Sequence, residues 1–595
     1  MTRVAAIIVL SLLAATAHAG NSLLAVSRDS RTVIAANRDN DSLSVVDVAG
    51  RKVLREISIG RTPESVAWIG SGPRAIATCY DDNAVVVLDA LSGVVVKKID
   101  TVPEPYGVVV DKAGRRAYVT NEYPGLVSVI DLETLAVEKT IAVGSFVRGL
   151  ALSIDESTLY VTHYYTGAVS AVNLASATVV DVWKQQSPTD NLARQIAVHP
   201  TRPFTYVPHL RSRTTQAHGA GSIFPYVAVL DLVPPDPDKR RRHPVAMDQF
   251  NDTRVTCNPW EIAVHPDGQR CYVVYAGTND LNVCKIVDDG QTYLERPSGR
   301  SLFKVGRNPR AVACSPDGRN VFVLNAIDFA LAVYDADPFR LKHEIKLCEP
   351  KLSPEIVRGK ELFNLAENPM SRLSWISCSS CHPDGDHDGR VWKQPEGMRR
   401  TTHFFGMSRT TPLHWSADRD EVQDFEHTIR GPLMQGSGLL SGKLPPPLGE
   451  PLAGRSKDLD ALAAYCNSLE APLSPHNAAG GKLTDAAKRG RTHFHSEKTG
   501  CATCHSGPDF TDKKRHDVGT GRDDKFEKMG YEYDTPSLVR TYRNLSWLHD
   551  GSATSLEAVV ANNPGDKHGR TSHLTADQRA DLVAFLKSLP FKDVP

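Results

Sequence analysis

Apolar and polar residues alternate in short runs over the first 350 positions, and the runs recur in a fixed order. One unit reads Pro105-Tyr-Gly-Val-Val-Val110, a polar turn at Lys112-Ala-Gly114, Ala117-Tyr-Val-Thr-Asn121, Val127-Ser-Val-Ile-Asp131 and Val137-Glu-Lys-Thr-Ile-Ala-Val143. Alternation with a period of two residues predicts β-strands, and the polar turns separate four short strands in each unit.

The unit recurs along the chain, and Pro63 and Pro105 open neighbouring copies 42 residues apart. We count seven units from Leu23 onward, with the other openings at Phe146, Ala193, Pro259 and Pro309. A four-stranded repeat of about 40–50 residues is typical of propeller blades, because one blade cannot bury both of its faces alone. The sequence therefore predicts an all-β, seven-bladed propeller over residues 20–350.

Two segments of these units, Tyr118-Val-Thr-Asn121 and Tyr160-Val-Thr-His163, resemble the YVTN family of β-propellers. The resemblance covers about 330 residues and implies a fold rather than a function, since propellers host binding, scaffolding and catalysis alike.

The fifth unit carries an insertion from about Pro208 to Pro225, which contains His209 and His218. We interpret it as an ordinary surface loop. The alternative is that the two histidines bind a metal or face a partner.

Strand alternation stops after Glu349, and helical spacing replaces it. Four stretches have apolar residues on one helical face: 353–363, 458–469, 486–494 and 575–589. They predict two all-α lobes, at residues 352–472 and 478–595, each with a helix near its start and another at its end.

Each lobe contains one Cys-x-x-Cys-His motif. The motifs are Cys378-Ser-Ser-Cys381-His382 and, about 120 residues later, Cys501-Ala-Thr-Cys504-His505. This spacing is typical of c-type haem attachment, in which two thiols bond to the porphyrin and the histidine binds the iron. Zinc is disfavoured because an adjacent Cys–His pair fits a tetrahedral clamp poorly. We expect two covalently bound c-type haems and a cytochrome c-like fold for each lobe.

The first 19 residues have the order of a secretory signal peptide. Arg3 precedes an apolar run from Val4 to Ala15, and Ala17-His-Ala19 offers small residues for cleavage. The run is too short to span a bilayer. We expect cleavage after Ala19, no later membrane span, and a periplasmic or secreted protein.

Composition adds little to this picture. The 69 basic and 69 acidic residues balance, which gives no reason to expect nucleic acid as a partner. Seven of the eleven cysteines lie outside the two motifs, and we assign no disulfide pairs among them.

The two lobes resemble the bacterial di-haem cytochrome c peroxidase and MauG family. The second lobe carries the motif-like segments His516-Asp-Val-Gly-Thr-Gly521, Asp534-Thr-Pro-Ser-Leu538 and Leu548-His-Asp-Gly-Ser552. The first lobe has Leu413-His-Trp415, with Arg399 sixteen residues before the tryptophan.

This resemblance implies an oxidoreductase in which one haem stores electrons and the other has an open iron position for hydrogen peroxide. It implies that Trp415 relays electrons between the haems and that Arg399 is the family's arginine. It also implies a calcium ion between the haems, bound near Asp534 and Pro536.

The peroxide pocket departs from the family pattern. Where the family has a Gln and a Glu, the aligned positions are Thr428 and Gly438. Glu426 is the nearby carboxylate that could substitute in moving protons.

The expected distal ligands, which bind iron opposite the proximal histidine, also depart from the family pattern. For the second haem, where the family uses Met or Tyr, we expect His568, with His573 and Met529 as alternatives. Two imidazoles generally lower the potential relative to a His/Met pair. For the first haem, the family's detachable His aligns near Trp392, so the iron is open or weakly bound, with His387 as the alternative ligand.

The leading hypothesis is an exported di-haem peroxidase/MauG-like enzyme whose propeller docks a redox partner protein or small electron donor. The alternative is a non-catalytic periplasmic electron-transfer protein whose haem lobes relay electrons. A propeller with its own redox cofactor is a third option, but no cluster of cofactor-binding residues in the propeller supports it.

Overall fold

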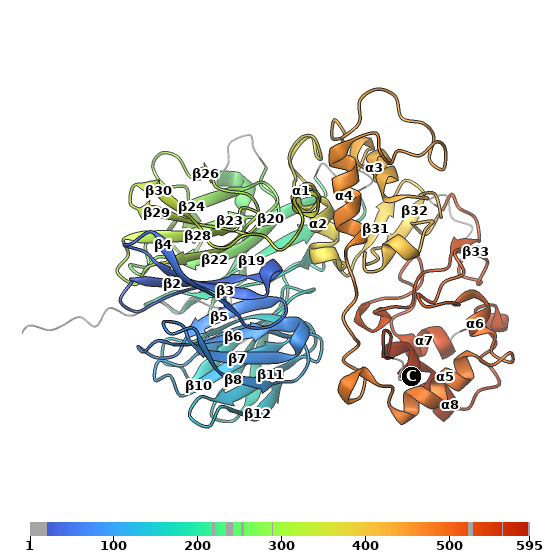
Figure 1. Ribbon diagram of the computed structural model, residues 1–595, viewed down its shortest axis with the longest axis horizontal. Coiled ribbons are helices and arrows are strands. Elements are labelled where there is room, and N and C mark those ends of the chain that lie inside the picture. The colour runs from blue at the N-terminus through green and yellow to red at the C-terminus, as the bar shows by residue number, and fades with distance from the viewer. Residues whose placement is uncertain are drawn as a thin grey trace, which may run out of the picture.

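The computed structural model describes residues 21–216, 221–233, 242–250, 255–287, 289–521, 527–561 and 563–592. The expected signal peptide and His218 lie outside the described residues. The chain forms a β-sheet unit followed by two smaller lobes with few helices (Figure 1). Among the described helices, none combines the length and the apolar character needed to pass through a membrane.

Seven antiparallel sheets build the N-terminal unit from consecutive strands. Blades one to three consist of β1 (Leu24–Val26), β2 (Thr32–Asn37), β3 (Ser42–Asp47), β4 (Lys52–Ser58), β5 (Pro63–Trp68), β6 (Arg74–Cys79), β7 (Ala84–Asp89), β8 (Val94–Asp100), β9 (Pro105–Val110), β10 (Arg116–Asn121), β11 (Leu126–Asp131) and β12 (Ala136–Ala142). Blades four and five consist of β13 (Val147–Leu152), β14 (Thr158–His163), β15 (Val169–Asn173), β16 (Thr178–Trp183), β17 (Asp190–Asn191), β18 (Ala197–Val198), β19 (Phe204–Ser212), β20 (Ile223–Asp231) and β21 (Arg242–Ala246). Blades six and seven consist of β22 (Pro259–Val264), β23 (Arg270–Tyr275), β24 (Asp280–Ile286), β25 (Leu294–Glu295), β26 (Leu302–Lys304), β27 (Pro309–Cys314), β28 (Asn320–Asn325), β29 (Ala330–Ala336) and β30 (Phe339–Lys346).

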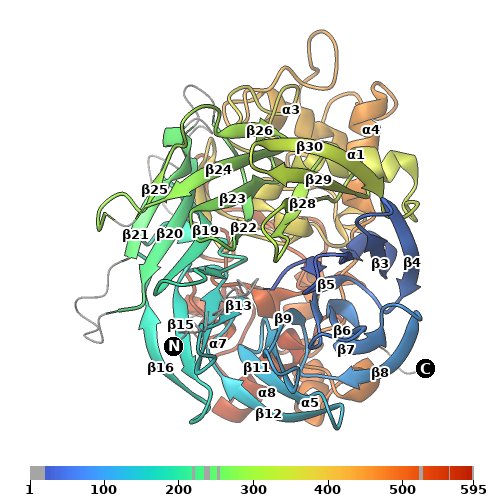
Figure 2. The ribbon, with the colours of Figure 1, turned by 90° about the vertical axis from the view of Figure 1, so that its left-hand side faces the viewer.

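The blades close into a ring. The first strands of neighbouring blades contact one another around the axis, and β1 of the first blade contacts β27 of the last. Figure 2 looks along this axis, with the two lobes behind the ring. The predicted seven-bladed propeller is confirmed, and its apolar positions pack between neighbouring blades.

The recurring threonine of the repeats joins one blade to the next. Thr120 Oγ1 accepts from Gly107 N at 2.9 Å within its own blade and donates to Arg148 O at 2.7 Å in the following blade. Thr78 repeats the bond to the next blade at 2.9 Å from Tyr106 O. The hydroxyl thus satisfies backbone groups at the buried contact between blades.

The lobes are helical only in part. The first contains α1 (Pro354–Asn364), α2 (Cys378–Cys381), α3 (Glu426–Arg430), α4 (Lys457–Asn467), β31 (Val391–Gln394) and β32 (Gly397–Arg400). The second contains α5 (Asp485–Phe494), α6 (Cys501–Cys504), α7 (Leu556–Ala561), α8 (Ala576–Lys587), β33 (Arg515–His516) and β34 (Tyr533–Asp534). The expectation of two all-α lobes is therefore corrected. Each lobe has a small helical framework, a two-stranded ribbon and long irregular segments, and its longer helices frame a cavity rather than pack into a helical bundle.

The long helices cross in the same way in both lobes. At Gly359 of α1, an added Cβ would overlap the Ala461 carbonyl oxygen of α4. At Gly490 of α5, it would overlap the Asp581 carbonyl oxygen of α8. An aromatic pair follows each crossing, with ring centroids 5.2 Å apart for both Phe363–Tyr465 and Phe494–Phe585.

A buried seam of charges joins the propeller to both lobes. Arg543 of the second lobe pairs with Glu122 at 2.9 Å and with Glu104, both from the propeller. It also pairs with Asp386 of the first lobe at 3.1 Å. Because all three chain segments meet at this guanidinium, the lobes are seated on one face of the ring.

The insertion in the fifth blade is not an ordinary surface loop. Its described residues extend β19 and β20 into one long hairpin, where His209 is buried with Nε2 3.5 Å from Asp190 Oδ1. The hairpin reaches the first lobe, as Phe224 meets Trp375 with ring centroids 4.9 Å apart. The surface-loop interpretation is wrong because these residues have sheet partners and a lobe to cover them.

Candidate functional site

The second lobe places its cysteine motif at the edge of a deep cavity. Helix α6 carries Cys501 and Cys504, and His505 caps its C-terminal end. His505 Nδ1 donates to the Phe510 carbonyl oxygen at 3.0 Å, which leaves Nε2 as the free nitrogen of a neutral ring. Burial lowers the pKa of His505 to about 4, so the ring is neutral at physiological pH.

The first lobe repeats this arrangement. Ser377 and Ser380 form a capping box at the start of α2, which carries Cys378 and Cys381. His382 Nδ1 donates to the Thr402 carbonyl oxygen at 2.8 Å, and burial lowers its pKa to about 4. In both lobes a backbone carbonyl thus fixes the tautomer that leaves Nε2 as a ligand.

The second cavity has about 1250 Å³ of empty space, its open mouth included. Both cysteines and His505 line it, and apolar side chains complete its walls: Phe494, Leu538, Trp547, Leu556, Val559, Val560, Leu582 and Leu586. His568 lines the same cavity, with its ring centroid 6.2 Å from that of His505. Two imidazoles bound to opposite sides of one metal ion, with metal–nitrogen bonds of about 2 Å, have centroids about 6 Å apart.

The first cavity has about 1340 Å³ of empty space, its mouth included, and is lined by Cys378, Cys381 and His382. Its apolar walls are Phe363, Ile376, Trp392, Phe404, Val422, Phe425, Leu433, Met434 and Leu462. Among the described residues, the ring in contact with His382 is Phe404, at 4.3 Å between centroids, and not a second histidine. Both cavities fit a haem, because each offers two thiols, an oriented imidazole and an apolar enclosure.

Three other candidate ligands lie away from the cavities. His387 is buried against the propeller, where it stacks on Tyr165 with centroids 5.5 Å apart. His573 is exposed, and Met529 is not among the residues that line the second cavity. The structure therefore brings only His568 of the expected second-haem ligands to the cavity.

Trp415 and Arg400 form a wall common to both cavities and to a third cavity between them. Trp415 Nε1 donates to the Arg400 carbonyl oxygen at 3.1 Å. The Trp415 carbonyl accepts from Asp534 N of the second lobe at 2.9 Å. Trp415 thus lies between the two haem-sized spaces, where the resemblance placed an electron relay.

Comparisons with known proteins show which family the chain belongs to. The hydrazine synthase subunit gamma of Kuenenia stuttgartiensis is 30% identical over 305 residues, which cover 42% of this chain and 80% of that protein. The methylamine utilization protein MauG of Methylorubrum extorquens is 30% identical over 301 residues, covering 42% of this chain and 83% of that protein. The chain belongs to the di-haem cytochrome c peroxidase and MauG family.

Two further comparisons complete this result. No family model matches the chain. One chain of the solved hydrazine synthase of Kuenenia stuttgartiensis is 18% identical with a TM-score of 0.47, covering 56% of this chain and 99% of that one. The two relatives in sequence each match 42% of the present chain.

Glu426 has a structural role, because hydrogen bonds within the protein hold its carboxylate. Its buried carboxylate accepts from the backbone N of Leu439 and Leu440 and from Arg430 Nε, at 2.7 to 3.0 Å. A Cβ at Gly438, the aligned position of the family's Glu, would overlap both Glu426 Oε1 and Arg430. Glu426 thus fills the space of the missing side chain, but it does not line the first cavity.

Arg399 links the two lobes through an ion pair. Its guanidinium makes a two-pronged ion pair with Glu527 of the second lobe, at 2.7 and 2.8 Å. It also lines the first cavity. Its neighbour Arg400 lines all three cavities, and burial lowers its pKa to about 10.

Asp534 is a buried carboxyl group at the junction of the lobes. It lines the second and third cavities, and its Oδ1 has no hydrogen-bond partner among the described residues. Burial, with Asp512 nearby, raises its pKa to about 8. An unsatisfied buried carboxyl oxygen fits the cation that the resemblance places here.

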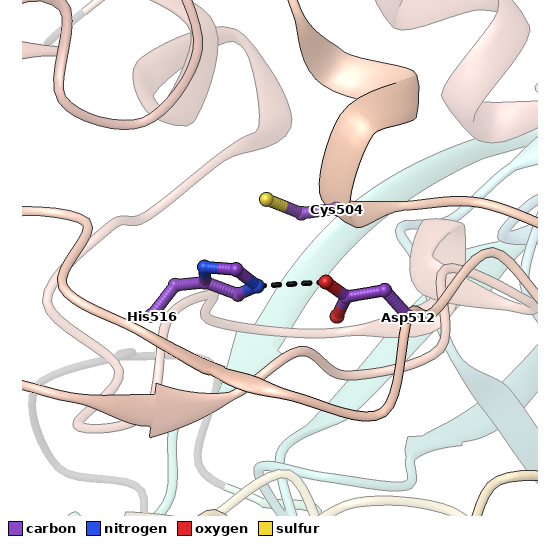
Figure 3. A group of neighbouring side chains, drawn as sticks. All are labelled: Cys504, Asp512 and His516. Atoms are coloured by element: carbon purple, nitrogen blue, oxygen red, sulfur yellow. Dashed lines mark hydrogen bonds and ion pairs between the residues drawn. The ribbon is translucent and has the colours of Figure 1, made fainter.

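Cys504, Asp512 and His516 bring ligand-type atoms within 4.8 Å of one another (Figure 3). His516 Nε2 and Asp512 Oδ2 already pair at 2.8 Å. Because Cys504 is the second thiol of the attachment motif, we assign this group to the edge of the haem cavity rather than to a separate metal.

The two attachment helices differ in exposure. Asn258 of the propeller donates from Nδ2 to Ser377 Oγ at 3.0 Å and to Ser379 Oγ at 3.1 Å, and accepts from Ser380 Oγ at 2.9 Å. Helix α2 is therefore buried under the ring. In helix α6, Thr503 has the motif position that Ser380 has in α2, and its side chain is exposed.

Sequence reasoning missed two cavity residues, Arg400 and His427. Arg400 had a signal in its place beside Arg399, but only the fold shows that Arg400 lines all three cavities, whereas Arg399 lines the first alone. His427 had a signal in its place beside Thr428, the aligned position of the family's Gln.

Proposed function

We propose that the chain is an exported di-haem c-type cytochrome oxidoreductase of the peroxidase/MauG type. Haems would attach at Cys378–Cys381 and at Cys501–Cys504, with His382 and His505 as proximal ligands. The first would be the reactive centre and the second the electron store.

One asymmetry between the two cavities carries this proposal. His505 faces a second imidazole, His568, at a spacing that suits two bonds to one iron. His382 has no such partner among the described residues, and its cavity is walled by Trp392 where the family has a detachable histidine. A six-coordinate iron favours electron transfer, whereas an open position admits a small substrate such as hydrogen peroxide.

The chain's own residues would then divide the work. A haem bound in the first cavity supplies the redox chemistry that no side chain offers. Trp415 bridges the cavities as the electron relay, and the Arg400 guanidinium lies beside both as a hydrogen-bond donor for anionic groups.

The propeller has two parts in this proposal. Its covered face seats the lobes through Asn258 and the Arg543 seam. Its opposite face and rim, which Figure 2 turns toward the viewer, are where a redox partner protein would dock. The alternative, a small electron donor, would reach the more exposed second attachment helix directly.

The test begins with the haem content and spin states of protein made in a cytochrome-maturing host. Denatured protein should retain two haems per chain, and one should be lost when Cys501 and Cys504 are both changed to Ser. Electron paramagnetic resonance of the ferric protein should show one high-spin and one low-spin signal. Hydrogen peroxide should change the optical spectrum of the high-spin haem.

Two low-spin signals that do not respond to peroxide would contradict the enzyme and favour the non-catalytic electron-transfer protein. A chain that releases all haem on denaturation would contradict both.

A further inference from the structure

The first cavity contains a histidine that the proposed function does not use. His414 lines this cavity, and its side chain is 31% exposed. Its Nδ1 lies 2.9 Å from Asp418 Oδ1. Among the hydrogen bonds of the described residues, this is the one that the His414 ring makes. The other ring nitrogen, Nε2, is therefore free to meet a molecule bound in the cavity.

Asp418 determines which nitrogen of the ring carries the proton. Ser416 Oγ donates to Asp418 Oδ1 at 2.9 Å, and Arg419 Nη1 donates to Oδ2 at 2.7 Å. Burial acts to raise the pKa of Asp418, but these two bonds and the one from His414 outweigh it and hold the pKa well below its usual range. Because the ionised carboxylate can only accept, Nδ1 carries the proton of the neutral ring and Nε2 has the lone pair.

The second lobe has an apolar side chain at the equivalent position. Each lobe has one turn whose first and seventh residues are joined by an antiparallel bridge, at 413–419 and at 547–553. The second residue of each turn has a left-handed backbone, with φ of 69° at His414 and 68° at Leu548. Leu548 lines the second cavity. The two lobes thus share this turn but place an imidazole at the first cavity and a leucine at the second.

The His414–Asp418 pair lies beside the helix that has the family's peroxide-pocket position. Phe425, the N-cap residue of α3, meets the His414 ring edge-on with centroids 5.1 Å apart. Thr428 of α3, at the aligned position of the family's Gln, lines the same cavity as His414 and Asp418. The Asp418 carboxylate is also close enough to His427 of α3 to affect its charge. The free nitrogen of His414 is therefore on the side of the cavity where the family binds peroxide.

We propose that His414, held by Asp418, is the acid–base residue of the first cavity. It would take over the work of the family's Gln and Glu, since the aligned Thr428 and Gly438 offer no base and Glu426 is bound to backbone amides. The inference rests on the proposed function, because it needs an open haem in this cavity.

The proton transfer is written for hydrogen peroxide. His414 Nε2 takes the proton of the oxygen nearer the iron and returns it to the far oxygen, which keeps the electron pair of the breaking O–O bond and leaves as water. Two electrons from the redox partner, delivered by way of the haems, and two protons from solvent convert the remaining oxygen into the second water. Asp418 stays ionised and stabilises the imidazolium between the two transfers. In sum, one peroxide, two electrons and two protons give two waters.

Cyanide binding to the ferric protein tests this role without turnover. Hydrogen cyanide loses its proton as it binds the iron, so a base in the cavity speeds association. His414→Leu introduces the side chain of the second lobe, which the same left-handed backbone already carries at Leu548. His414→Asn keeps a polar group and tolerates a positive φ but offers no base. In both variants we expect the association rate, measured by stopped-flow absorbance, to fall about 100-fold, at the lower end of general acid–base effects.

Two controls separate proton transfer from a change of cavity shape. Carbon monoxide binds the ferrous protein without losing a proton, so its association rate should be the same in wild type and in both His414 variants. His573→Gln removes an exposed histidine that lines neither haem cavity, and this variant should bind cyanide at the wild-type rate.

The outcomes distinguish this inference from the proposed function. Cyanide rates that are unchanged in both His414 variants, or that fall together with the carbon monoxide rates, would overturn the role of His414 and leave the proposed function standing. A first haem that changes from low-spin to high-spin in these variants would make His414 an iron ligand and overturn both proposals. A wild-type protein that binds no cyanide would also overturn both.

Discussion

At the residue scale, single side chains decide how two similar lobes come to differ. Both lobes supply two cysteines and an imidazole with its Nδ1 bound to a carbonyl. Among the described residues, only the second lobe adds another histidine ring, His568, at the distance that an iron ion would bridge. In the proposed function, the difference between a storing and a reacting haem rests on this one imidazole.

Replacing His568 by Met should change the second haem. A thioether donates less strongly to ferric iron than an imidazole, so the midpoint potential should rise by on the order of 0.1 V, within the ~0.8 V that axial ligands span. Potentiometric titration with optical detection measures the shift. His573→Met is the control, because His573 is exposed and should leave the potential unchanged. A shift in the control and none in His568→Met would refute the assignment.

Calcium should stabilise the holo protein through Asp534. The buried Oδ1 of this carboxyl group lacks a partner among the described residues, so a bound cation would satisfy it. Saturating Ca²⁺ should raise the melting temperature by several degrees. Asp534→Asn should abolish the response, whereas Asp485→Asn at the exposed start of α5 should retain it. An unchanged response in Asp534→Asn would place any calcium elsewhere.

At the element scale, the crossing of two helices sets the frame of each lobe. Gly359 and Gly490 allow the first helix to touch the backbone of the last, and an aromatic pair packs beside each crossing. This close approach holds the cysteine helix and the cavity walls together, so the cavity depends on a glycine that has no chemical role.

Gly490→Ala should destabilise the second lobe. Alanine improves helix propensity by about 1 kcal/mol, but its Cβ would overlap the Asp581 carbonyl oxygen and force the helices apart. Overpacking costs about 1–3 kcal/mol, and a clash with backbone belongs at the upper end. Thermal unfolding should show a melting temperature several degrees lower. Gly72→Ala, where the added Cβ meets no atom within 4 Å, should be neutral. A stabilised Gly490→Ala protein would mean that the crossing is looser than described.

At the scale of the whole molecule, the propeller contacts the attachment segment of the first lobe directly and is not a separate module. Asn258 binds the serines of α2, and Asp384, two residues after His382, pairs with Arg310 of the ring at 2.7 Å. The ring thereby holds the segment that carries the first Cys-x-x-Cys-His motif.

Arg543→Met should loosen the contact between the ring and the lobes. The substitution would leave Glu104, Glu122 and Asp386 buried without their common cation, and breaking such a pair costs about 3–5 kcal/mol. Limited proteolysis and thermal unfolding should both show the loss. Arg489→Met removes an exposed pair with Asp581, which is worth at most about 1 kcal/mol. Equal behaviour of the two variants would show that the seam contributes little.

Local sequence patterns predicted much of the fold and of the candidate site. Seven blades follow from alternation and spacing, and the attachment motifs follow from five consecutive residues each. Both features depend on residues that are close together in the chain, so the sequence alone predicts them. The sequence alone predicted a surface loop at residues 208–225, because the lobe that covers this hairpin is far away in sequence.

By itself, then, the sequence determined the ring of seven blades, the family of the lobes and the positions of the cysteines and proximal histidines. The tertiary structure decided that His568 rather than His573 faces His505, that Glu426 turns to backbone amides, and that Arg400 and His427 line the cavities. The reason is physical: spacing along a chain fixes which residues lie together locally, whereas the direction of a side chain at a cavity depends on segments brought there by long-range packing.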